Sequence, residues 1–431
     1  MKKGHLMITI LLYIAIQFLF FSLAAIDNVH FYRPNFYWGE PRLECPWLNT
    51  IDVAVGTGKT RSGYNGKGKK TNILNIYGVQ NMHKLADNAT DLNPANSLDA
   101  ILINLNNLPE QKNFGQLKLK GKFHTIESDI SIYQNIKHGF FFQLHIPARK
   151  LSVNPNIENQ NDLAALDLSP EGTTPPNKTS PEWQAFLNNF FSILKQQNIS
   201  VRPLNRSGIG DVSLLAGWSC SYQNTTYLDF IDVAAKIGVL FPTGKKRNPD
   251  NVFDLPQGYD GHWGVPLKFD LSIGAWEWFT GGLHIGSLFL AERTKTLRIQ
   301  TSDTQNSFIK LTKTEATFDP GIYFDFDLFI KGDHLWRGFS VLLAYSFNFK
   351  EKDNIEPKRS DFNKKIANND IMLAGWNQHI LHFLIEYDFA KKMTDIGTRI
   401  GIFYNHVLDG KRMWRTHMKG GSIGLDCAWR F

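Results

Sequence analysis

From Leu48 to the C-terminus, apolar and polar residues alternate with a period of two. In 339–349, Phe, Val, Leu, Tyr and Phe occupy every second position, and most residues between them are small or polar. Successive side chains of a β-strand point to opposite faces, so this pattern predicts strands with one apolar face. Alternation alone fits a β-sandwich with a dry interior and also a membrane barrel with an apolar wall and a wet lumen.

Three further features favour the barrel. The alternating stretches run for about 10 to 14 residues, longer than most globular strands and long enough for a tilted membrane crossing. Their connections are short at 135–139, 223–228, 277–282 and 331–338, and long at 58–114, 152–207, 242–264 and 350–375. Short turns at one end and long loops at the other are typical of outer-membrane barrels. The chain also ends in alternating apolar residues, among them Leu425, Trp429 and Phe431. A terminal Phe on such a strand resembles the signal that the bacterial barrel-assembly machinery reads.

We therefore predict an all-β fold, an antiparallel transmembrane β-barrel of about twelve strands. Fourteen strands are the alternative if Ile73–Tyr77 and Ile101–Leu105 also pair as strands. The twelve predicted crossings are Leu48–Thr57, Leu117–Gln134, Phe140–Leu151, Asp211–Tyr222, Asp229–Phe241, Val265–Trp276, Leu283–Glu292, Lys313–Phe329, Phe339–Phe349, Asn377–Phe389, Thr398–Val407 and Gly420–Phe431.

Three segments lie outside this pattern. Residues 1–25 predict a secretory signal, with Lys2 and Lys3 before an apolar core. Residues 26–47 are rich in aromatic residues and do not alternate, which suits a hatch in the lumen or a strap across the periplasmic mouth. Within the loop 152–207, an apolar stripe at helical spacing predicts an amphipathic helix over Pro181–Lys195. The barrel with its loops then occupies 48–431.

The composition and the motifs argue against several classes of protein. Aromatic residues make up 13% of the 431 positions, and the mean hydropathy of −0.26 is too polar for a bundle of membrane helices. The net charge of +7 falls to about +5 without the leader, too mild and too dispersed for nucleic-acid binding. No outward Ser stands in a catalytic motif beside His379 or His406, and no acidic pair suggests hydrolysis. We therefore expect neither an enzyme nor a cofactor or metal site.

The faces that alternate with the apolar positions carry charged and polar residues, which we assign to the lumen. The candidates are Glu127, Asp129, Gln143, His145, Arg149, Lys236, Lys268, Asp270, Asp319, Tyr323, Asp325, Asp327, Glu386 and Asp388.

One motif resembles a known family. Gly208-Ile209-Gly210-Asp211 opens one predicted strand, and the next ends in Pro242-Thr243-Gly244-Lys245. This resembles the outer-membrane transporters associated with phenol and other aromatic degradation, distant relatives of the long-chain fatty-acid channels. The resemblance implies uptake of small hydrophobic molecules. Those channels carry Asn-Pro-Ala in an N-terminal hatch, whereas here Asn93-Pro94-Ala95 follows the first predicted strand, so the resemblance assigns no hatch residue.

The sequence thus predicts an outer-membrane channel for passive uptake of small, in part hydrophobic, solutes. Its expected partners are outer-membrane lipid, the assembly machinery and a small-molecule solute. The alternative is a barrel whose lumen charges pair across a plugged interior, serving a structural or surface-binding role without transport.

Overall fold

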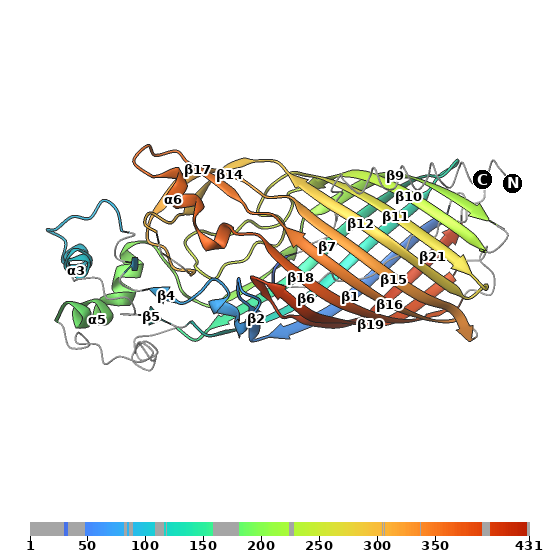
Figure 1. Cartoon of the computed structure of the whole chain (residues 1–431), viewed down its shortest axis with the longest axis horizontal. Helices are drawn as coiled ribbons and strands as arrows, with labels where there is room; N and C mark the ends of the chain where they lie inside the picture. Colours follow the sequence, from blue (N-terminus) through green and yellow to red (C-terminus); the bar gives the residue numbers. More distant parts are fainter. Residues whose placement is uncertain are drawn as a thin grey trace.

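The computed structural model describes residues 30–32, 48–81, 84–85, 89–107, 116–117, 119–157, 181–223, 228–303, 305, 307–336, 338–389 and 397–428. In this part of the chain, twelve antiparallel strands form a closed ring (Figure 1). The all-β, twelve-stranded prediction is confirmed. In order around the ring, the strands are β6 (Gly121–Asn135), β1 (Leu48–Thr60), β21 (His417–Ala428), β19 (Gly397–Lys411), β18 (Trp376–Asp388), β16 (Phe339–Lys350), β15 (Tyr323–Trp336), β12 (Phe279–Leu290), β11 (Gly264–Ala275), β10 (Phe230–Phe241), β9 (Val212–Gln223) and β7 (Phe140–Pro155).

Three pairings close this ring. The first wall strand, β1, pairs with the last, β21, and also with β6, and β6 pairs in turn with β7. Strand β8 (Leu204–Ile209) pairs with the half of β7 beyond the β9 pairing, so β8 and β9 follow one line interrupted near Gly210. A closed ring leaves the wall no free strand edge across the membrane.

The two faces of the wall differ as the sequence pattern predicts. On β16, Val341 and Leu343 are 45% and 38% exposed, whereas Ser340, Leu342 and Ala344 are buried. Other exposed apolar side chains on the wall include Val55, Ile130, Leu214, Ile237, Val265, Leu328, Ile330, Phe383, Ile400, Ile402 and Ile423. At the end with short turns, Trp276 and Trp336 are 71% and 65% exposed, as in the aromatic belt of a membrane barrel. The outer surface therefore suits contact with lipid.

The predicted crossing Lys313–Phe329 is wrong, because it consists of two separate strands. Strand β14 (Lys313–Asp319) leaves the wall and pairs with β13 (Arg293–Arg298) and β17 (Asn354–Pro357), whereas β15 starts only at Tyr323. Pro320 lacks a backbone N–H, and a Cβ at Gly321 would lie 2.5 Å from the Glu351 carbonyl oxygen. The alternation of apolar and polar residues therefore continues across Pro320-Gly321, although the strand itself is interrupted there.

The fourteen-strand alternative is also wrong. Ile73–Asn75 forms a short 3-10 helix, η1, whose preceding residue Asn72 accepts a hydrogen bond from the Leu74 N–H. Residues 101–105 lie in helix α3 (Ser97–Asn106), where Leu102 and Leu105 are buried at helical spacing. Short apolar runs fit a strand or a buried helix equally well, so periodicity could not decide.

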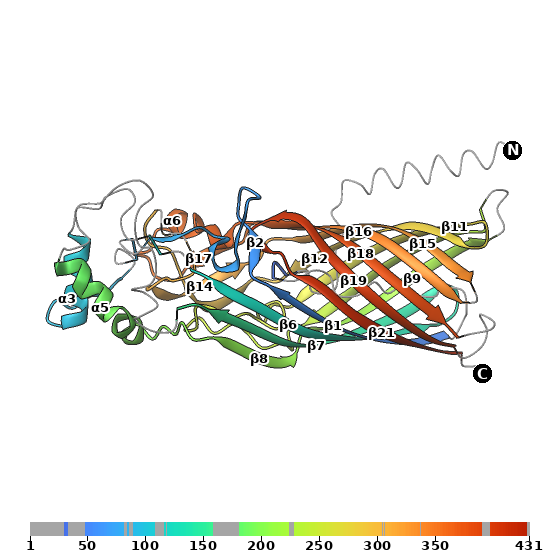
Figure 2. The same ribbon diagram turned by 90° about the horizontal axis from the view of Figure 1, so that it is seen from below.

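The long loops build a second layer at one end of the barrel. It contains the sheet β13–β14–β17, the sheet of β2 (Ser62–Tyr64), β3 (Lys70–Asn72) and β20 (Met413–Trp414), the pair β4 (Gln80–Asn81) and β5 (Gln116–Leu117), and the helices α6 (Lys364–Asn368) and η2 (Ile371–Leu373). Figure 2 shows β14, β17 and α6 at one end of the wall strands. We call this end the loop end and the opposite one the turn end.

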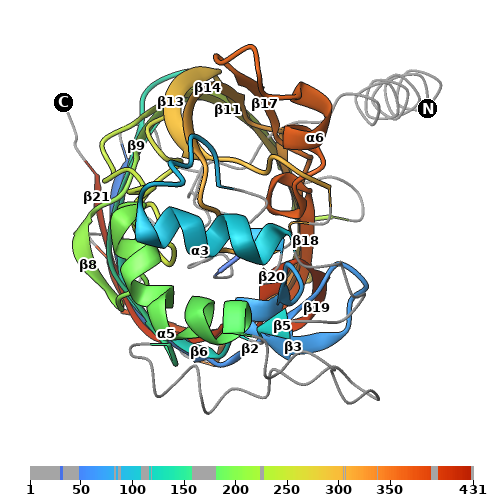
Figure 3. The same cartoon turned by 90° about the vertical axis from the view of Figure 1, so that its left-hand side faces the viewer.

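Two helices lie across the opening at the loop end (Figure 3). They are α3 and α5 (Pro181–Gln196), and α5 confirms the predicted amphipathic helix. The α5 side chains Phe186, Phe190, Ile193 and Leu194 are buried in an apolar core shared with α3. Within the described ranges, no helix has both the length and the apolar character for a membrane crossing.

Several predicted features lie outside the described residues and stay predictions. They are the signal 1–25 and, at the C-terminus, Trp429 and Phe431. Leu425 lies on β21 with its side chain 43% exposed. Of the segment 26–47, the structure describes only 30–32.

Candidate functional site

Thirteen of the fourteen predicted lumen residues lie on the inward side of the wall. Two of them are half-buried, His145 and Lys268. The others are buried: Glu127, Asp129, Gln143, Arg149, Lys236, Asp270, Tyr323, Asp325, Asp327, Glu386 and Asp388. The fourteenth, Asp319, was predicted for the lumen by parity, and this is wrong. It is exposed on β14, opposite Asn354 of β17, because the chain leaves the wall before Pro320.

Many inward charges pair with their neighbours. Lys236 Nζ lies 2.6 Å from Asp270 Oδ2, and His284 Nδ1 lies 2.6 Å from Asp270 Oδ1. Glu127 and Arg149 form a buried ion pair at 3.2 Å between β6 and β7. The inward face is therefore polar, and its charges compensate one another across strand boundaries.

The largest of these clusters centres on Arg399 of β19, which was not among the predicted lumen residues. Arg399 Nη2 donates to Asp52 Oδ1 at 3.0 Å, and Nη1 donates to Glu386 Oε2 at 3.4 Å. Its Nε faces Asp426 Oδ2 at 3.3 Å as an ion pair. Arg399, Asp52 and Asp426 alternate with apolar neighbours on predicted strands, so parity could have identified them.

At the loop end, the barrel holds a cavity of about 500 Å³, which we call the chamber. Its lining comes from the loop 242–263, the sheet β13–β14–β17, the segment 370–376 and the inner ends of β15 and β18. Ten Phe, Tyr and Trp residues contribute to its wall, together with eight Lys and Arg and four Asp. The described lining is thus aromatic and carries an excess of four positive charges, counting His as neutral.

Residues 30–32 are part of the lining of this chamber. Tyr32 is fully buried; its hydroxyl donates to the Pro256 carbonyl at 3.0 Å, and Thr416 Oγ1 donates to the Tyr32 carbonyl at 2.6 Å. The backbone N–H of Trp414 donates to the Phe31 carbonyl at 2.6 Å. This short piece of the N-terminal segment therefore bonds to several elements around the loop end of the barrel.

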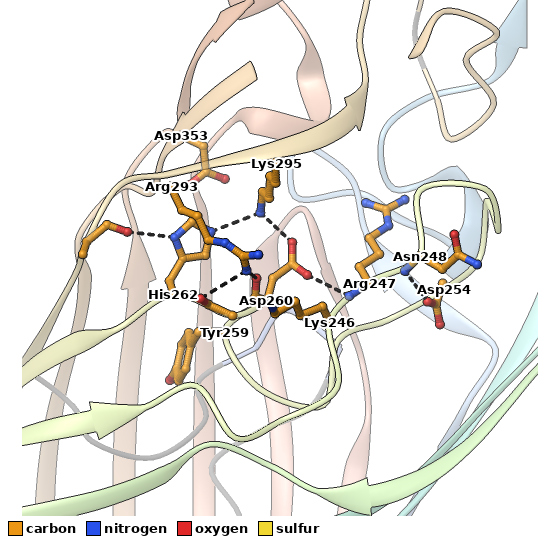
Figure 4. Close-up of polar contacts among 12 residues, drawn as sticks. Lys246, Arg247, Asn248, Asp254, Tyr259, Asp260, His262, Arg293, Lys295 and Asp353 are labelled. Carbon is orange, nitrogen blue, oxygen red and sulfur yellow. Dashed lines mark hydrogen bonds and ion pairs between the residues drawn. The ribbon is translucent and has the colours of Figure 1, made fainter. Parts of the chain in front are cut away.

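A polar group of three side chains, Asp260, His262 and Lys295, forms one wall of the chamber (Figure 4). Lys295 Nζ donates to Asp260 Oδ2 at 2.5 Å and contacts His262 Nε2 at 3.1 Å, and it lies 3.9 Å from the centre of the Phe318 ring. His262 Nδ1 contacts the Ala291 carbonyl at 2.8 Å. Burial, reinforced by the Lys295 charge, lowers the pKa of His262 to about 4. The imidazole is therefore neutral at pH 7, with Nδ1–H donating to Ala291 and Nε2 accepting from Lys295.

The ionisation of Lys295 and Asp260 follows from the same contacts. Burial lowers the pKa of Lys295, and Asp260 opposes that change. The pKa of Asp260 is lowered despite its burial, because Lys295 and the Arg247 N–H stabilise its carboxylate. The Lys295–Asp260 ion pair holds the loop 242–263 against β13.

The family-like motif explains how this loop is positioned. Asp211 is buried and accepts from the Gly244 N–H at 2.7 Å and from the Tyr259 N–H. Thr243 Oγ1 donates to the Gly210 carbonyl at 2.6 Å and accepts from the Val212 N–H at 3.0 Å. The two halves of the motif thus meet in space and fix both ends of the loop that carries Asp260 and His262.

The charged chamber residues on the loops could not be predicted from the sequence. Lys246, Asp260, His262, Arg293 and Lys295 lie on long loops or on strands outside the wall, where no alternation marks the direction of a side chain. Only the motif at Asp211 and Thr243 pointed toward this region. Within the described residues, no group of three or more His, Cys, Asp or Glu side chains is arranged to hold a metal ion.

Several solved structures are similar to this chain. An outer membrane channel from Pseudomonas putida F1 is 9% identical, with a TM-score of 0.49, over 94% of this chain and 100% of that one. A Pseudomonas aeruginosa FadL homologue is 7% identical, with a TM-score of 0.28, over 88% of each chain. The translocator domain of the autotransporter NalP from Neisseria meningitidis is 8% identical, with a TM-score of 0.31, over 90% of this chain and 91% of that one. No protein-family model and no curated protein sequence matches the chain.

The class of this protein follows from its own strand pairing. A closed antiparallel ring with an apolar outer face, a polar inner face, short turns at one end and long loops at the other is a bacterial outer-membrane β-barrel.

Proposed function

We propose that this barrel is an outer-membrane channel for the passive uptake of small solutes that enter through the chamber. The observation that carries the proposal is the chamber itself, a cavity of about 500 Å³ at the loop end with an aromatic and basic lining. Pockets of this size suit ligands of small-molecule dimensions, and aromatic walls suit solutes with an apolar body. The proposal assigns the protein no catalytic role.

Residues 30–32 act in this proposal as a plug in the entrance. Four of their polar contacts go to Pro256, Gln378, Trp414 and Thr416, which belong to separate parts of the loop end. The Tyr32 ring also packs against Phe123 and Trp414, with ring centres 5.7 and 6.2 Å apart. Solute entry then requires these contacts to loosen, so the channel has low conductance at rest.

A second function is favoured by the inward ion pairs. Because Arg399 and Asp270 already bond to inward charges on nearby strands, the lumen resembles that of a barrel closed by its own side chains. In that case the chamber binds a solute at the cell surface and no transport follows. The two functions differ in whether the purified protein conducts ions.

Conductance in planar bilayers tests the proposal. We expect small, discrete openings for the native protein and larger or longer openings for Tyr32→Ala, which removes the ring contacts and the bond to Pro256. Tyr222→Ala is the matched control, because Tyr222 is 45% exposed on β9 and lies outside the chamber. If neither the native protein nor Tyr32→Ala conducts, the channel function is wrong and the surface-binding alternative stands.

At the C-terminus, we propose that Leu425, Trp429 and Phe431 form the signal for barrel assembly. Replacing Phe431 by Asp should leave export intact and reduce the amount of protein inserted in the outer membrane. Normal insertion of this variant would contradict the assignment.

A further inference from the structure

The chamber contains more positive charge than its acids compensate. Five of its eight basic residues have a carboxylate partner. Lys295 pairs with Asp260, Lys310 with Asp370 and Lys350 with Asp353, while Arg298 and Lys313 share Asp250. The fourth chamber acid, Asp254, pairs with Arg206, which lies outside the chamber wall. Within the described residues, the side chains of Lys246, Arg247 and Arg293 form no ion pair with a carboxylate.

Two of these three cations lie together. A Cβ built on Gly261 would lie 2.2 Å from Arg293 Nη1 and 2.6 Å from Lys246 Cε, so the two side chains converge over this glycine. Gly261 has φ +80°, a backbone conformation that favours glycine, and its missing Cβ leaves room for both side chains. Figure 4 shows Lys246 and Arg293 on the same side of the polar group, with Arg247 turned away from them.

The hydrogen bonds of Arg293 leave most of its guanidinium available. The guanidinium makes two long hydrogen bonds, both from Nη1, to the Gly261 carbonyl at 3.3 Å and to the Asp260 carbonyl at 3.5 Å. Lys246 is exposed, so its ammonium is hydrated and mobile enough to meet a ligand. Two like charges repel each other, and an oxyanion between them would relieve that repulsion and accept several charge-assisted hydrogen bonds.

The surroundings indicate what the anion is attached to. Tyr259 and Tyr323 pack edge to face with ring centres 5.1 Å apart, and Tyr323 and Trp376 continue this aromatic wall at 6.2 Å. All three residues line the same chamber as Lys246 and Arg293. A ligand with a charged end and a flat apolar body matches both parts of the lining.

We propose that the Lys246–Arg293 pair binds the oxyanion, a carboxylate or a phosphate, of a small solute whose apolar body rests on the aromatic wall. This proposal deepens the proposed function and rests on it, since it names the class of solute that the channel takes. Arg293 supplies a planar fork of N–H donors and Lys246 supplies a mobile ammonium. Gly261 allows both to reach one point.

Titration calorimetry of the full barrel in detergent, with benzoate, phenyl phosphate, benzamide and acetate, tests the site. Benzoate or phenyl phosphate should bind at least about tenfold more tightly than neutral benzamide, through charge-assisted hydrogen bonds. Acetate, which lacks the ring, should bind more weakly than benzoate. The preferred ring-bearing anion identifies the oxyanion.

The double variant Lys246→Gln with Arg293→Gln should reduce benzoate binding to the level of benzamide and leave benzamide binding unchanged. The matched control is Arg202→Gln with Lys358→Gln, which removes the same charge from two exposed residues outside the chamber. Gly261→Ala should weaken anion binding without any change of charge, because the added methyl group displaces both side chains. Each variant is first checked for the folded barrel by its mobility in an unheated gel.

The outcomes separate this inference from the proposed function. If benzoate and benzamide bind equally, or if the control pair loses as much affinity as the chamber pair, the anion site is wrong even in a conducting barrel. If benzoate binding depends on Lys246 and Arg293 while no bilayer conductance appears, the anion site stands and the transport function fails.

Discussion

Replacing Arg399 by Met should destabilise the barrel more than any other single change to the inner wall. The guanidinium is 7% exposed and hydrogen-bonds Asp52 and Glu386, which are themselves buried. Hydrogen bonds to charged groups contribute about 1.5–3 kcal/mol each, so losing both costs about 3–6 kcal/mol. Removing one partner of a buried ion pair typically costs about 3–5 kcal/mol, which agrees. Asp426 loses less, because Thr50 still donates to it at 2.8 Å.

The assay is urea-induced unfolding in lipid vesicles, followed by tryptophan fluorescence and by mobility in unheated gels. A second variant carries Arg399→Met with Asp52→Asn and Glu386→Gln, which removes the charges of both carboxylates along with the guanidinium. We expect this triple variant to recover more than half of the lost free energy of unfolding. If Arg399→Met unfolds within about 1 kcal/mol of the native protein, water already solvates these carboxylates and the inner wall is more open than its burial indicates.

Three further predictions concern the outer face, the corrected strand and the loop end. Leu328→Arg places a charge on the lipid side near the middle of β15 and should cost about 2–4 kcal/mol in vesicle unfolding; an unchanged stability would mean that this face does not meet hydrocarbon. In a conducting barrel, Asp325→Asn should shift the reversal potential toward anion preference, whereas Asp319→Asn should not, since Asp319 is exposed on β14; equal shifts would contradict the corrected strand boundary. A folded-state pKa of about 4 for His262, against about 6.5 when unfolded, means that its contribution to stability is present above pH 6.5 and is lost as the pH falls toward 4. His262→Gln should therefore remove about 3 kcal/mol of the pH dependence of unfolding between pH 7 and 4, and identical pH profiles for both proteins would show that the imidazole is solvated.

Strand periodicity predicted the wall strands well. Each wall strand separates lipid from a polar interior, so apolar side chains that face lipid alternate with polar side chains that face inward. The prediction was wrong where the alternation of apolar and polar residues continues beyond the barrel wall. Asp319 is the example, because Pro320 and Gly321 turn the chain away from the wall. The prediction also failed for short apolar runs such as Ile101–Leu105, where the helix and strand interpretations share the same residues.

The chamber could not be predicted for a different reason. Lys246 and Arg293 are far apart in the sequence, and they converge only because Asp211 and Thr243 fix the loop between β10 and β11. Arg399 is the opposite case, since it alternates with apolar neighbours on β19 and its inward direction can be predicted from the sequence. Positions on regular strands can therefore be assigned from the sequence, whereas contacts between loops depend on tertiary structure.

The pairing of the first wall strand with the last also constrains the order of folding. The pair Leu48↔Ala428 joins residues near opposite ends of the described chain, so this contact forms only after the chain from β1 through β21 has been synthesised and delivered. Bringing such distant segments together costs loop entropy and slows folding. Until β21 arrives, β1 and β19 each present an unpaired edge that can join another chain. A chain truncated before His417 keeps both edges and should aggregate in the periplasm, so the final twelve-residue strand protects the whole assembly from misassociation.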